Sequence, residues 1–286
     1  MVIKVVYITD ETIEKFIKED IPYIDLTTLV LGIDKELSTI QFKSRETAII
    51  SGTEEVMRIF QKFNIETEYF LPSGSKVQPG EVFLKAKGNA DAIHMGWKVS
   101  LNILEYCSGI ATRTNNLVTL AKEINENMEI VTTRKIFPGT KELSIKSVIA
   151  GGGYPHRLGL SETILIFKQH LNILGGLDEF IKNLISIKAK ALEKKILVEV
   201  DNLDDALKVA NAGVDGIQFD KLPPEKLKII VQEIRKISDK ITLIGTGGIN
   251  ESNIKEYAKT GVDTISTTSV YFGKPVDIGV EIMKGE

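Results

Sequence analysis

Residues 130–170 read IVTTRKIFPGTKELSIKSVIAGGGYPHRLGLSETILIFKQH, and this stretch decides the fold of the chain. Its β-branched start, Ile130 to Thr133, predicts a strand, and residues 141–150 have the spacing of a helix. Three glycines at 151–153 come before a second apolar run, Ile164 to Phe167, which predicts another strand. Glycines let the backbone approach a ligand closely, so the segment is also a candidate binding site.

Two basic pairs stand in this segment. Arg134 and Lys135 come directly after the first predicted strand, and His156 and Arg157 follow the three glycines. Cations placed just beyond a strand end suit a bound anion, and two such pairs predict a ligand with several negative groups, such as a carboxylate together with phosphates. A solvated charge cluster is the alternative, and the repetition of the pattern within one stretch disfavours it.

The composition excludes several classes of protein. With 43% hydrophobic and 26% charged residues, the 286-residue chain has the balance of a soluble globular protein of one or two domains. Its net charge of -3 gives no support for a nucleic-acid partner, and no apolar run has membrane-spanning length. The start of the chain lacks the basic and apolar regions of a signal peptide, so we expect a cytoplasmic protein that inserts into no membrane.

The cysteine and histidine content argues against disulfides and transition metals. Cys107 is the only cysteine, and its helical neighbours Leu104 and Ile110 predict that it lies in the core. The three histidines form no pattern with the spacing of zinc ligands. We therefore expect no transition metal and no organic cofactor.

The N-terminal part mixes short strands and helices. A helix is predicted over residues 10–19 with Asp10 as its cap, and another over residues 54–63. Strand-like runs, such as GEVFLKAKG at 80–88, alternate with turn residues. This mixture predicts an α+β sandwich domain over residues 1–106. We expect the C-terminal tail, residues 273–286, to be part of the same domain.

The remainder, residues 107–272, has the pattern of a β/α barrel. Gly109 interrupts a long helical pattern and is predicted to separate two helices. Four strand-and-helix units then follow, with apolar strands that start at residues 196, 216, 241 and 263. Such units predict a parallel sheet covered on both faces, and the lack of a dinucleotide fingerprint favours a barrel. Six or seven strands are counted, so the expected fold is α/β with an incomplete barrel.

Acids and small residues end these strands, where barrels carry their active sites. Glu199 and Asp220 could hold magnesium with substrate phosphates, or steady a positively charged transition state through the sugar. Asp201 is instead a predicted helix N-cap. GTGG at 245–248 leads into a predicted helix whose positive end could cradle a phosphate, with a simple tight turn as the alternative.

The motif TTRKIFPGTKELSIKSVIAGGGYPHRLGL, residues 132–160, closely resembles the quinolinate (nicotinate-nucleotide) phosphoribosyltransferases. It is closer still to a sister group, the ModD pyrophosphorylases associated with molybdenum transport, and the resemblance covers nearly the whole chain. It implies a pentosyltransferase that joins phosphoribosyl pyrophosphate to an aromatic nitrogen-containing acid and releases pyrophosphate, as in NAD biosynthesis. It also implies a homodimer or higher homo-oligomer, because the family's sandwich domain packs against a second subunit's barrel.

The resemblance also implies a role for each candidate residue. The acids that match those on the ribose and the magnesium-pyrophosphate group are Glu199 and Asp220, the expected metal ligands. The loops that match the 5′-phosphate site contain Thr246, Gly247, Gly248, Thr267 and Thr268. The basic residues that match those around the pyridine carboxylates and the pyrophosphate are Arg134, Lys135, His156 and Arg157. The expected catalytic residues are Glu199, Asp220 and Lys135.

Three departures from the family lie on the side of the base. Phe167 stands where the family has a lysine that meets a substrate carboxylate, and Lys168 beside it is expected on the opposite side of the strand. Lys98 stands where the family has an arginine that reaches the neighbouring subunit's site. The alternative is that Lys98 is an ordinary exposed cation on a helix. Tyr154-Pro155 replaces a basic or polar pair before His156. We therefore expect quinolinate itself not to be the physiological base.

Two other functions stay open. One is a non-catalytic accessory protein that binds an oxyanion or a phosphosugar in connection with molybdate transport. Glu199 and Asp220 disfavour it, because plain anion binding gains nothing from carboxylates. The other is a barrel isomerase or aldolase, which the scarcity of lysines at the strand ends disfavours, since only Lys135 and Lys168 are found there.

Overall fold

The computed structural model describes residues 6–285 and divides them into two compact units. The first contains residues 6–115, 136–152 and 271–285, and the second contains residues 116–135 and 153–270. Helix α4 (Ala90–Lys122) begins in the first unit and ends in the second. The chain therefore passes between the units more often than a division into residues 1–106 and 107–272 implies.

A four-stranded antiparallel sheet forms the base of the first unit. Its strand order is β13-β1-β5-β3. The strands are β1 (Leu37–Ser44), β3 (Glu66–Phe70), β5 (Val82–Asn89) and β13 (Ile278–Lys284). Buried and less buried residues alternate along β1, as a strand with one face on the core requires. The C-terminal strand β13 pairs with β1, and β2 (Ala48–Ile49) and β4 (Lys76–Val77) form a separate two-stranded ribbon.

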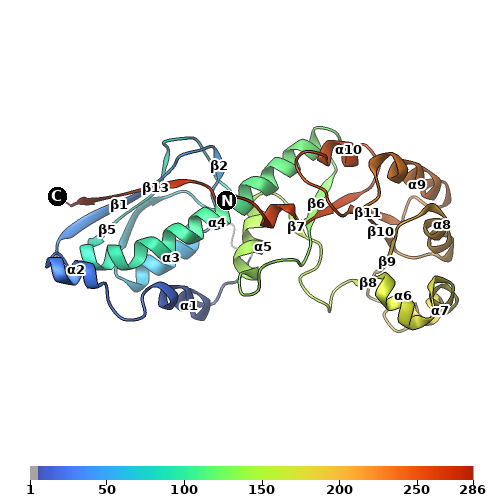
Figure 1. The fold of residues 1–286 in the computed structure, drawn as a ribbon, viewed down its shortest axis with the longest axis horizontal. Helices are drawn as coiled ribbons and strands as arrows, with labels where there is room; N and C mark the ends of the chain where they lie inside the picture. Colours follow the sequence, from blue (N-terminus) through green and yellow to red (C-terminus); the bar gives the residue numbers. More distant parts are fainter. Residues whose placement is uncertain (1–5, 286) are drawn as a thin grey trace. The chain divides into compact units, whose positions relative to one another are not determined.

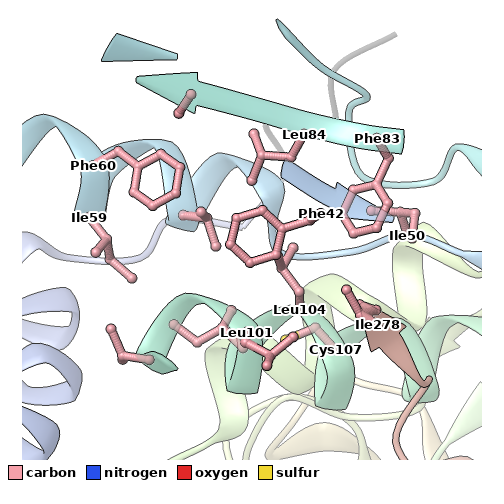
Figure 2. Close-up of a cluster of buried hydrophobic side chains, with 14 of the residues drawn as sticks. Phe42, Ile50, Ile59, Phe60, Phe83, Leu84, Leu101, Leu104, Cys107 and Ile278 are labelled. Atoms are coloured by element: carbon pink, nitrogen blue, oxygen red, sulfur yellow. The ribbon is translucent and has the colours of Figure 1, made fainter. Parts of the chain in front are cut away.

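Helices α1 (Asp10–Asp20), α3 (Thr53–Lys62) and α5 (Lys141–Ala150), with the start of α4, contribute buried residues to the apolar core of this unit. The short helix α2 (Leu26–Leu31) does not belong to this core, and its leucine and valine side chains are exposed. Figure 2 shows side chains of α3, α4 and the strands meeting in that core around Phe42 and Leu104. Cys107 lies among them, as predicted, and burial raises the pKa of its thiol to about 12.

Two local predictions in the first unit are wrong. Helix α1 is capped by Thr9, whose side-chain oxygen accepts a hydrogen bond from the Thr12 N–H at 3.1 Å, and not by Asp10. Gly109 does not end a helix, because α4 is continuous through it. A β-carbon at Gly109 would lie 3.1 Å from the Lys274 carbonyl oxygen and 3.3 Å from Pro275 Cα. Because glycine has no β-carbon, residues 274–275 can approach the helix closely at this point.

The second unit is built on a seven-stranded parallel sheet in the order β7-β6-β12-β11-β10-β9-β8. The strands are β6 (Glu129–Thr132), β7 (Tyr154–Pro155), β8 (Ile164–Ile166), β9 (Ile196–Val200), β10 (Gly216–Asp220), β11 (Thr242–Thr246) and β12 (Thr264–Thr267). The edge strands β7 and β8 do not pair with each other, so the barrel is open. The predicted α/β fold, with an incomplete barrel of six or seven strands and a separate N-terminal α+β domain, is confirmed.

Helices flank this sheet (Figure 1). They are α6 (Lys168–Leu174), α7 (Leu177–Ala189), α8 (Leu203–Ala212), α9 (Pro224–Ile237) and α10 (Ile254–Ala258), followed by the 3-10 turn η1 (Ser269–Tyr271). Within residues 6–285, no helix has both the length and the apolar character needed to cross a membrane.

The starts of two helices in the second unit differ from the predictions. Asn202, not Asp201, caps α8, and its side-chain oxygen accepts from the Asp205 N–H at 2.9 Å. The GTGG motif does not lead into a helix, because α10 begins only at Ile254. The side-chain amides of Asn250 and Asn253 donate instead to the Gly248 carbonyl oxygen, at 3.3 and 3.1 Å, and form an asparagine-rich turn.

Candidate active site

The carboxyl ends of the parallel strands surround a pocket of about 270 Å³ in the second unit. Because all seven strands point the same way, their ends meet at one edge of the sheet. Every strand contributes a residue from within it or just after it. The lining residues are Thr133, Arg134, Lys135, His156, Arg157, Leu165, Phe167, Glu199, Gln218, Asp220, Thr246 and Ser266. The two predicted basic pairs and the two predicted acids therefore meet in one pocket.

Carboxylates from two neighbouring strands form the acidic side of the pocket. Glu199 on β9 pairs in register with Gln218 on β10, and Gln218 Nε2 donates to Glu199 Oε2 at 2.7 Å. Asp220 lies two residues beyond Gln218 and so on the same face of the strand. Burial raises the pKa of Glu199 and the charge of Asp220 adds to this, whereas Gln218 and Lys135 act in the opposite direction.

The end of β10 is held tightly by the loop after β11. Lys221, directly after Asp220, has a left-handed backbone with φ 58°, which is uncommon for a residue other than glycine. Its N–H donates to the Thr246 carbonyl oxygen at 2.8 Å. Gly247 has φ 89°, and a β-carbon there would lie 2.7 Å from the Lys221 nitrogen. This position in GTGG therefore accepts only glycine.

Basic side chains form the opposite side of the pocket. Arg134 and Lys135 are exposed, whereas the Arg157 side chain is buried and its Nη1 donates to the Thr163 carbonyl oxygen at 3.4 Å. Burial lowers the pKa of Arg157, and the nearby charge of Arg134 lowers it further. Burial also lowers the pKa of His156, followed by the charge of Arg157. The repulsion between the charges of Arg134 and Arg157 favours an anionic ligand beside them.

An aromatic side chain stands beside the cations. The Phe167 ring is stacked on the His170 ring with centroids 5.8 Å apart, and the Phe167 N–H donates to His170 Nδ1 at 3.0 Å. The Arg157 guanidinium carbon lies 5.9 Å from the Phe167 ring centroid. Phe167 lines the pocket, whereas Lys168 lines an adjoining pocket. The pocket therefore presents an aromatic face, and no lysine, at this point of its wall.

The predicted phosphate-binding residues are distributed between the pocket and the loops around it. Thr246 lines the pocket. Thr267 Oγ1 donates to the Ile249 carbonyl oxygen at 2.6 Å, and the hydroxyl oxygens of Thr268 and Thr133 lie 2.8 Å apart. These hydroxyl groups connect the loops after β11, β12 and β6. Their contact with a phosphate stays a prediction.

Lys98 lies in the first unit, on α4. Its side chain is exposed, and Nζ lies 4.9 Å from the centroid of the Trp97 ring. It is not among the residues that line the pocket of the second unit. Its predicted role in the site of a neighbouring subunit stays a prediction.

Sequence reasoning missed Gln218, Thr133 and Leu165 as lining residues. For Gln218 a signal was present, because it stands two residues before Asp220 and must share its face of the strand. Its bond to Glu199 could not be inferred, since that depends on the register between β9 and β10.

Among residues 6–285, no group of three or more His, Cys, Asp or Glu side chains could hold a metal ion.

Comparison with known proteins covers both units. The chain matches the sequence profile of the quinolinate phosphoribosyl transferase C-terminal domain over residues 110–281 and that of the N-terminal domain over residues 25–108. It is similar to the proposed pyrophosphorylase ModD of Pasteurella multocida, with 36% identity over 97% of this chain and 99% of that protein. A proposed carboxylating nicotinate-nucleotide pyrophosphorylase of Methanothermobacter thermautotrophicus is 32% identical over 95% of this chain and 98% of that protein.

The fold is also similar to solved structures. The nicotinate-nucleotide pyrophosphorylase from Francisella tularensis superposes with a TM-score of 0.87 and 27% identity, over 97% of this chain and 98% of that one. The corresponding protein from Ehrlichia chaffeensis has a TM-score of 0.88 at 24% identity, over 97% and 99% of the two chains. The family resemblance seen in residues 132–160 is thereby confirmed over nearly the full length of the chain.

Proposed function

The chain belongs to the quinolinate phosphoribosyltransferase family of pentosyltransferases, and on that premise we propose that it joins phosphoribosyl pyrophosphate to an aromatic nitrogen-containing acid other than quinolinate. A ring nitrogen of the acid forms the new bond to C1 of the ribose, and pyrophosphate leaves with the electrons of the broken C1–O bond. One observation carries the proposal: the same pocket combines two carboxylates with four basic side chains.

The carboxylates suit the ribose and the developing charge at C1. As the bond to pyrophosphate breaks, the sugar ring takes on oxocarbenium-like positive charge, which Glu199 and Asp220 stabilise. Their oxygens also accept hydrogen bonds from the ribose hydroxyl groups. In this chemistry the protein contributes positioning and electrostatics, with no covalent nucleophile.

Magnesium fits the same two acids. Burial raises the pKa of Glu199, and the charge of Asp220 raises it further. The acidic side of the pocket therefore carries negative charge that a cation would compensate. Carboxylate oxygens are preferred ligands of Mg²⁺, which usually takes one or two of them together with substrate phosphates. When bound with phosphoribosyl pyrophosphate, the ion would neutralise charge on the leaving pyrophosphate.

The basic side chains suit the pyrophosphate and the carboxylate of the base. Arg134 and Lys135 would hold the leaving group and neutralise its charge, and Lys135 lies near enough to Glu199 for its charge to lower the pKa of that acid. His156 and Arg157 would bind the acid group of the base. Thr246, Gly247 and Gly248, with Thr267 and Thr268, would surround the 5′-phosphate.

The base side favours an acid with one carboxylate. Phe167 offers an aromatic face where a second carboxylate would need a cation, and a buried unpaired carboxylate is strongly unfavourable. An aromatic base can pack against the Phe167 ring while its single acid group meets Arg157, whose guanidinium lies over that ring. The positions of Phe167 and Lys98 therefore argue against quinolinate.

We further propose a cytoplasmic homodimer whose sites are shared, because the family resemblance assigns Lys98 to the site of a second subunit. The resemblance to the ModD group motivates a role connected with molybdenum transport, and the similarity to nicotinate-nucleotide pyrophosphorylases motivates a role in NAD biosynthesis. The departures at Phe167 and Lys98 disfavour the latter, because they argue against quinolinate as the base.

Calorimetry with phosphoribosyl pyrophosphate and magnesium tests the proposed function. We expect binding to the wild type, at least tenfold weaker binding to Asp220→Ala, and unchanged binding to Asp239→Ala, an exposed acid outside the pocket. Failure of the wild type to bind at millimolar ligand would rule out the proposal.

A further inference from the structure

Gln218 is a buried amide inside the candidate site. The residue is 6% exposed and lines the pocket, beside Glu199 on the neighbouring strand and two residues before Asp220 on its own strand. Because β9 and β10 are parallel and Gln218 is in register with Glu199, the two side chains stand next to each other on the same face of the sheet. Gln218 Nε2 donates to Glu199 Oε2 at 2.7 Å.

This hydrogen bond has a defined chemical direction. An ionised carboxylate can only accept, so the amide must present its nitrogen to Glu199. A hydrogen bond to a charged acceptor is among the stronger ones in proteins, and it restricts rotation of the acid. One oxygen of Glu199 is thereby bonded to the protein, and the residue itself lines the pocket.

An unrestrained Glu199 would be a poor ligand for a sugar. A glutamate side chain has three rotatable torsions, and its terminal torsion is broad. Asp220, the next acid in the pocket, repels it and adds to the rise of its pKa by burial. Without a donor beside it, the carboxylate would gain by turning away from Asp220, out of the position that a ribose hydroxyl requires.

We propose that Gln218 is a positioning residue, which holds the Glu199 carboxylate in the orientation that binds the ribose of phosphoribosyl pyrophosphate. The proposal rests on the proposed function, because it takes Glu199 as a ribose ligand. It assigns Gln218 no contact with the reacting atoms. Gln218 acts only through the acid on the next strand.

The matched pair of variants is Gln218→Met and Gln41→Met. Methionine has a similar length and keeps the apolar contacts, but it donates no hydrogen bond. Gln41 is the control because its Nε2 also donates to a glutamate on a neighbouring strand, Glu281 Oε2 at 2.5 Å, in the sheet of the first unit. Both substitutions thus remove the same kind of bond, one inside the pocket and one outside it.

Calorimetry with phosphoribosyl pyrophosphate and magnesium is then run on Gln218→Met, Glu199→Gln and the variant that carries both changes. Loss of a hydrogen bond to a charged group corresponds to about ten- to a hundredfold in affinity, which we expect for Gln218→Met but not for Gln41→Met. The double variant should bind no more weakly than Glu199→Gln alone, because two residues that act through one contact are not additive. A purely structural role would instead give independent losses.

The outcomes separate this inference from the proposed function. If Gln218→Met weakens binding by the same factor with Glu199 present and with Glu199→Gln, Gln218 does not act through Glu199 and the inference is overturned. It is also overturned if Gln218→Met binds like the wild type while Glu199→Gln binds weakly. If Glu199→Gln binds like the wild type, the ribose role of Glu199 itself is wrong, and the inference falls with it.

Discussion

Gly247 lies directly against the carboxylate of Asp220: a β-carbon at position 247 would stand 2.5 Å from Asp220 Oδ1. The glycine comes from the loop after β11 and the acid ends β10, and these strands are neighbours in the sheet. The Lys221 N–H holds the same two loops together through the Thr246 carbonyl oxygen. The GTGG loop therefore packs directly against Asp220, one of the two acids of the site.

Gly247→Ala should disrupt the site. The added methyl group would collide with Asp220 Oδ1 and the Lys221 backbone. The backbone φ at this position is 89°, a conformation that residues other than glycine rarely adopt. We expect at least a tenfold loss of affinity for phosphoribosyl pyrophosphate by calorimetry and a lower Tm. Gly245→Ala is the control, since a β-carbon there makes no contact closer than 3.5 Å. Wild-type affinity in Gly247→Ala would show that the packing against Asp220 is unimportant.

Lys221→Asn should stabilise the protein. Lys221 has φ 58°, a left-handed conformation that costs about 1–2 kcal/mol for most residues and that asparagine adopts more readily than lysine, so the substitution relieves part of this strain. Chemical denaturation would measure the gain in the free energy of unfolding. The reverse swap, Asn64→Lys at φ 56° in the first unit, should destabilise by a similar amount. Equal stability of Lys221→Asn and the wild type would argue that the surrounding loops absorb the strain.

The free energy of unfolding should decrease as the pH is lowered below about 6.5, because His156 takes up a proton more readily in the unfolded chain. Burial, followed by the charge of Arg157, lowers the pKa of His156 below its ordinary value of 6.5. As the pH falls below about 6.5, the unfolded chain takes up a proton that the folded protein does not, so stability decreases until the folded-state pKa is passed.

Denaturation curves between pH 7.5 and 5 test this expectation, run on the wild type, on His156→Asn and on His94→Asn as a control from the first unit. The His156→Asn variant should lose less unfolding free energy over this range than either of the others. Parallel pH profiles for all three proteins would contradict the assignment.

Quinolinate should be a poor substrate. With Phe167 in place of a lysine and Lys98 in place of an arginine, one of its two carboxylates lacks a full set of charged partners. The loss of one charged hydrogen bond costs about 1.5–3 kcal/mol, or about ten- to a hundredfold in affinity. Steady-state kinetics should therefore show weak or absent turnover, with improvement in a variant that combines Phe167→Lys and Lys98→Arg. Efficient formation of nicotinate mononucleotide by the wild type at micromolar quinolinate would refute this.

Shared sites predict complementation between inactive variants. Lys98→Ala and Arg134→Ala should each lower activity strongly, because one removes a cation given to the neighbouring subunit and the other removes a cation of the subunit's own pocket. Mixing the two proteins under exchange should restore part of the activity through hybrid dimers that contain one intact site. A fully active monomer, measured by sedimentation at assay concentration, would exclude the shared-site arrangement.

Much of the fold followed from local patterns in the sequence. Segments rich in apolar residues, such as Ile196–Val200 and Gly216–Asp220, form strands where the pattern predicts them, because a strand buried on both faces is mostly apolar. The meeting of the two basic pairs with Glu199 and Asp220 also followed from the sequence. Parallel strands bring their carboxyl ends to one edge, so residues that end separate strands meet even though they are far apart along the chain.

Only the tertiary structure decided the contacts between these strand ends. Gly109 has the pattern of a helix break, yet α4 continues through it, and the missing side chain instead lets residues 274–275 pack closely against the helix. The donor beside Glu199 and the glycine against Asp220 likewise depend on the registers of β9, β10 and β11. Propensity and periodicity are properties of a few neighbouring residues, whereas register and close approach are set by packing between segments that are distant in sequence. For that reason the sequence by itself determined that the two basic pairs and the two acids meet at one edge of the sheet, and the fold determined which further residues line the pocket and which neighbour orients each of them.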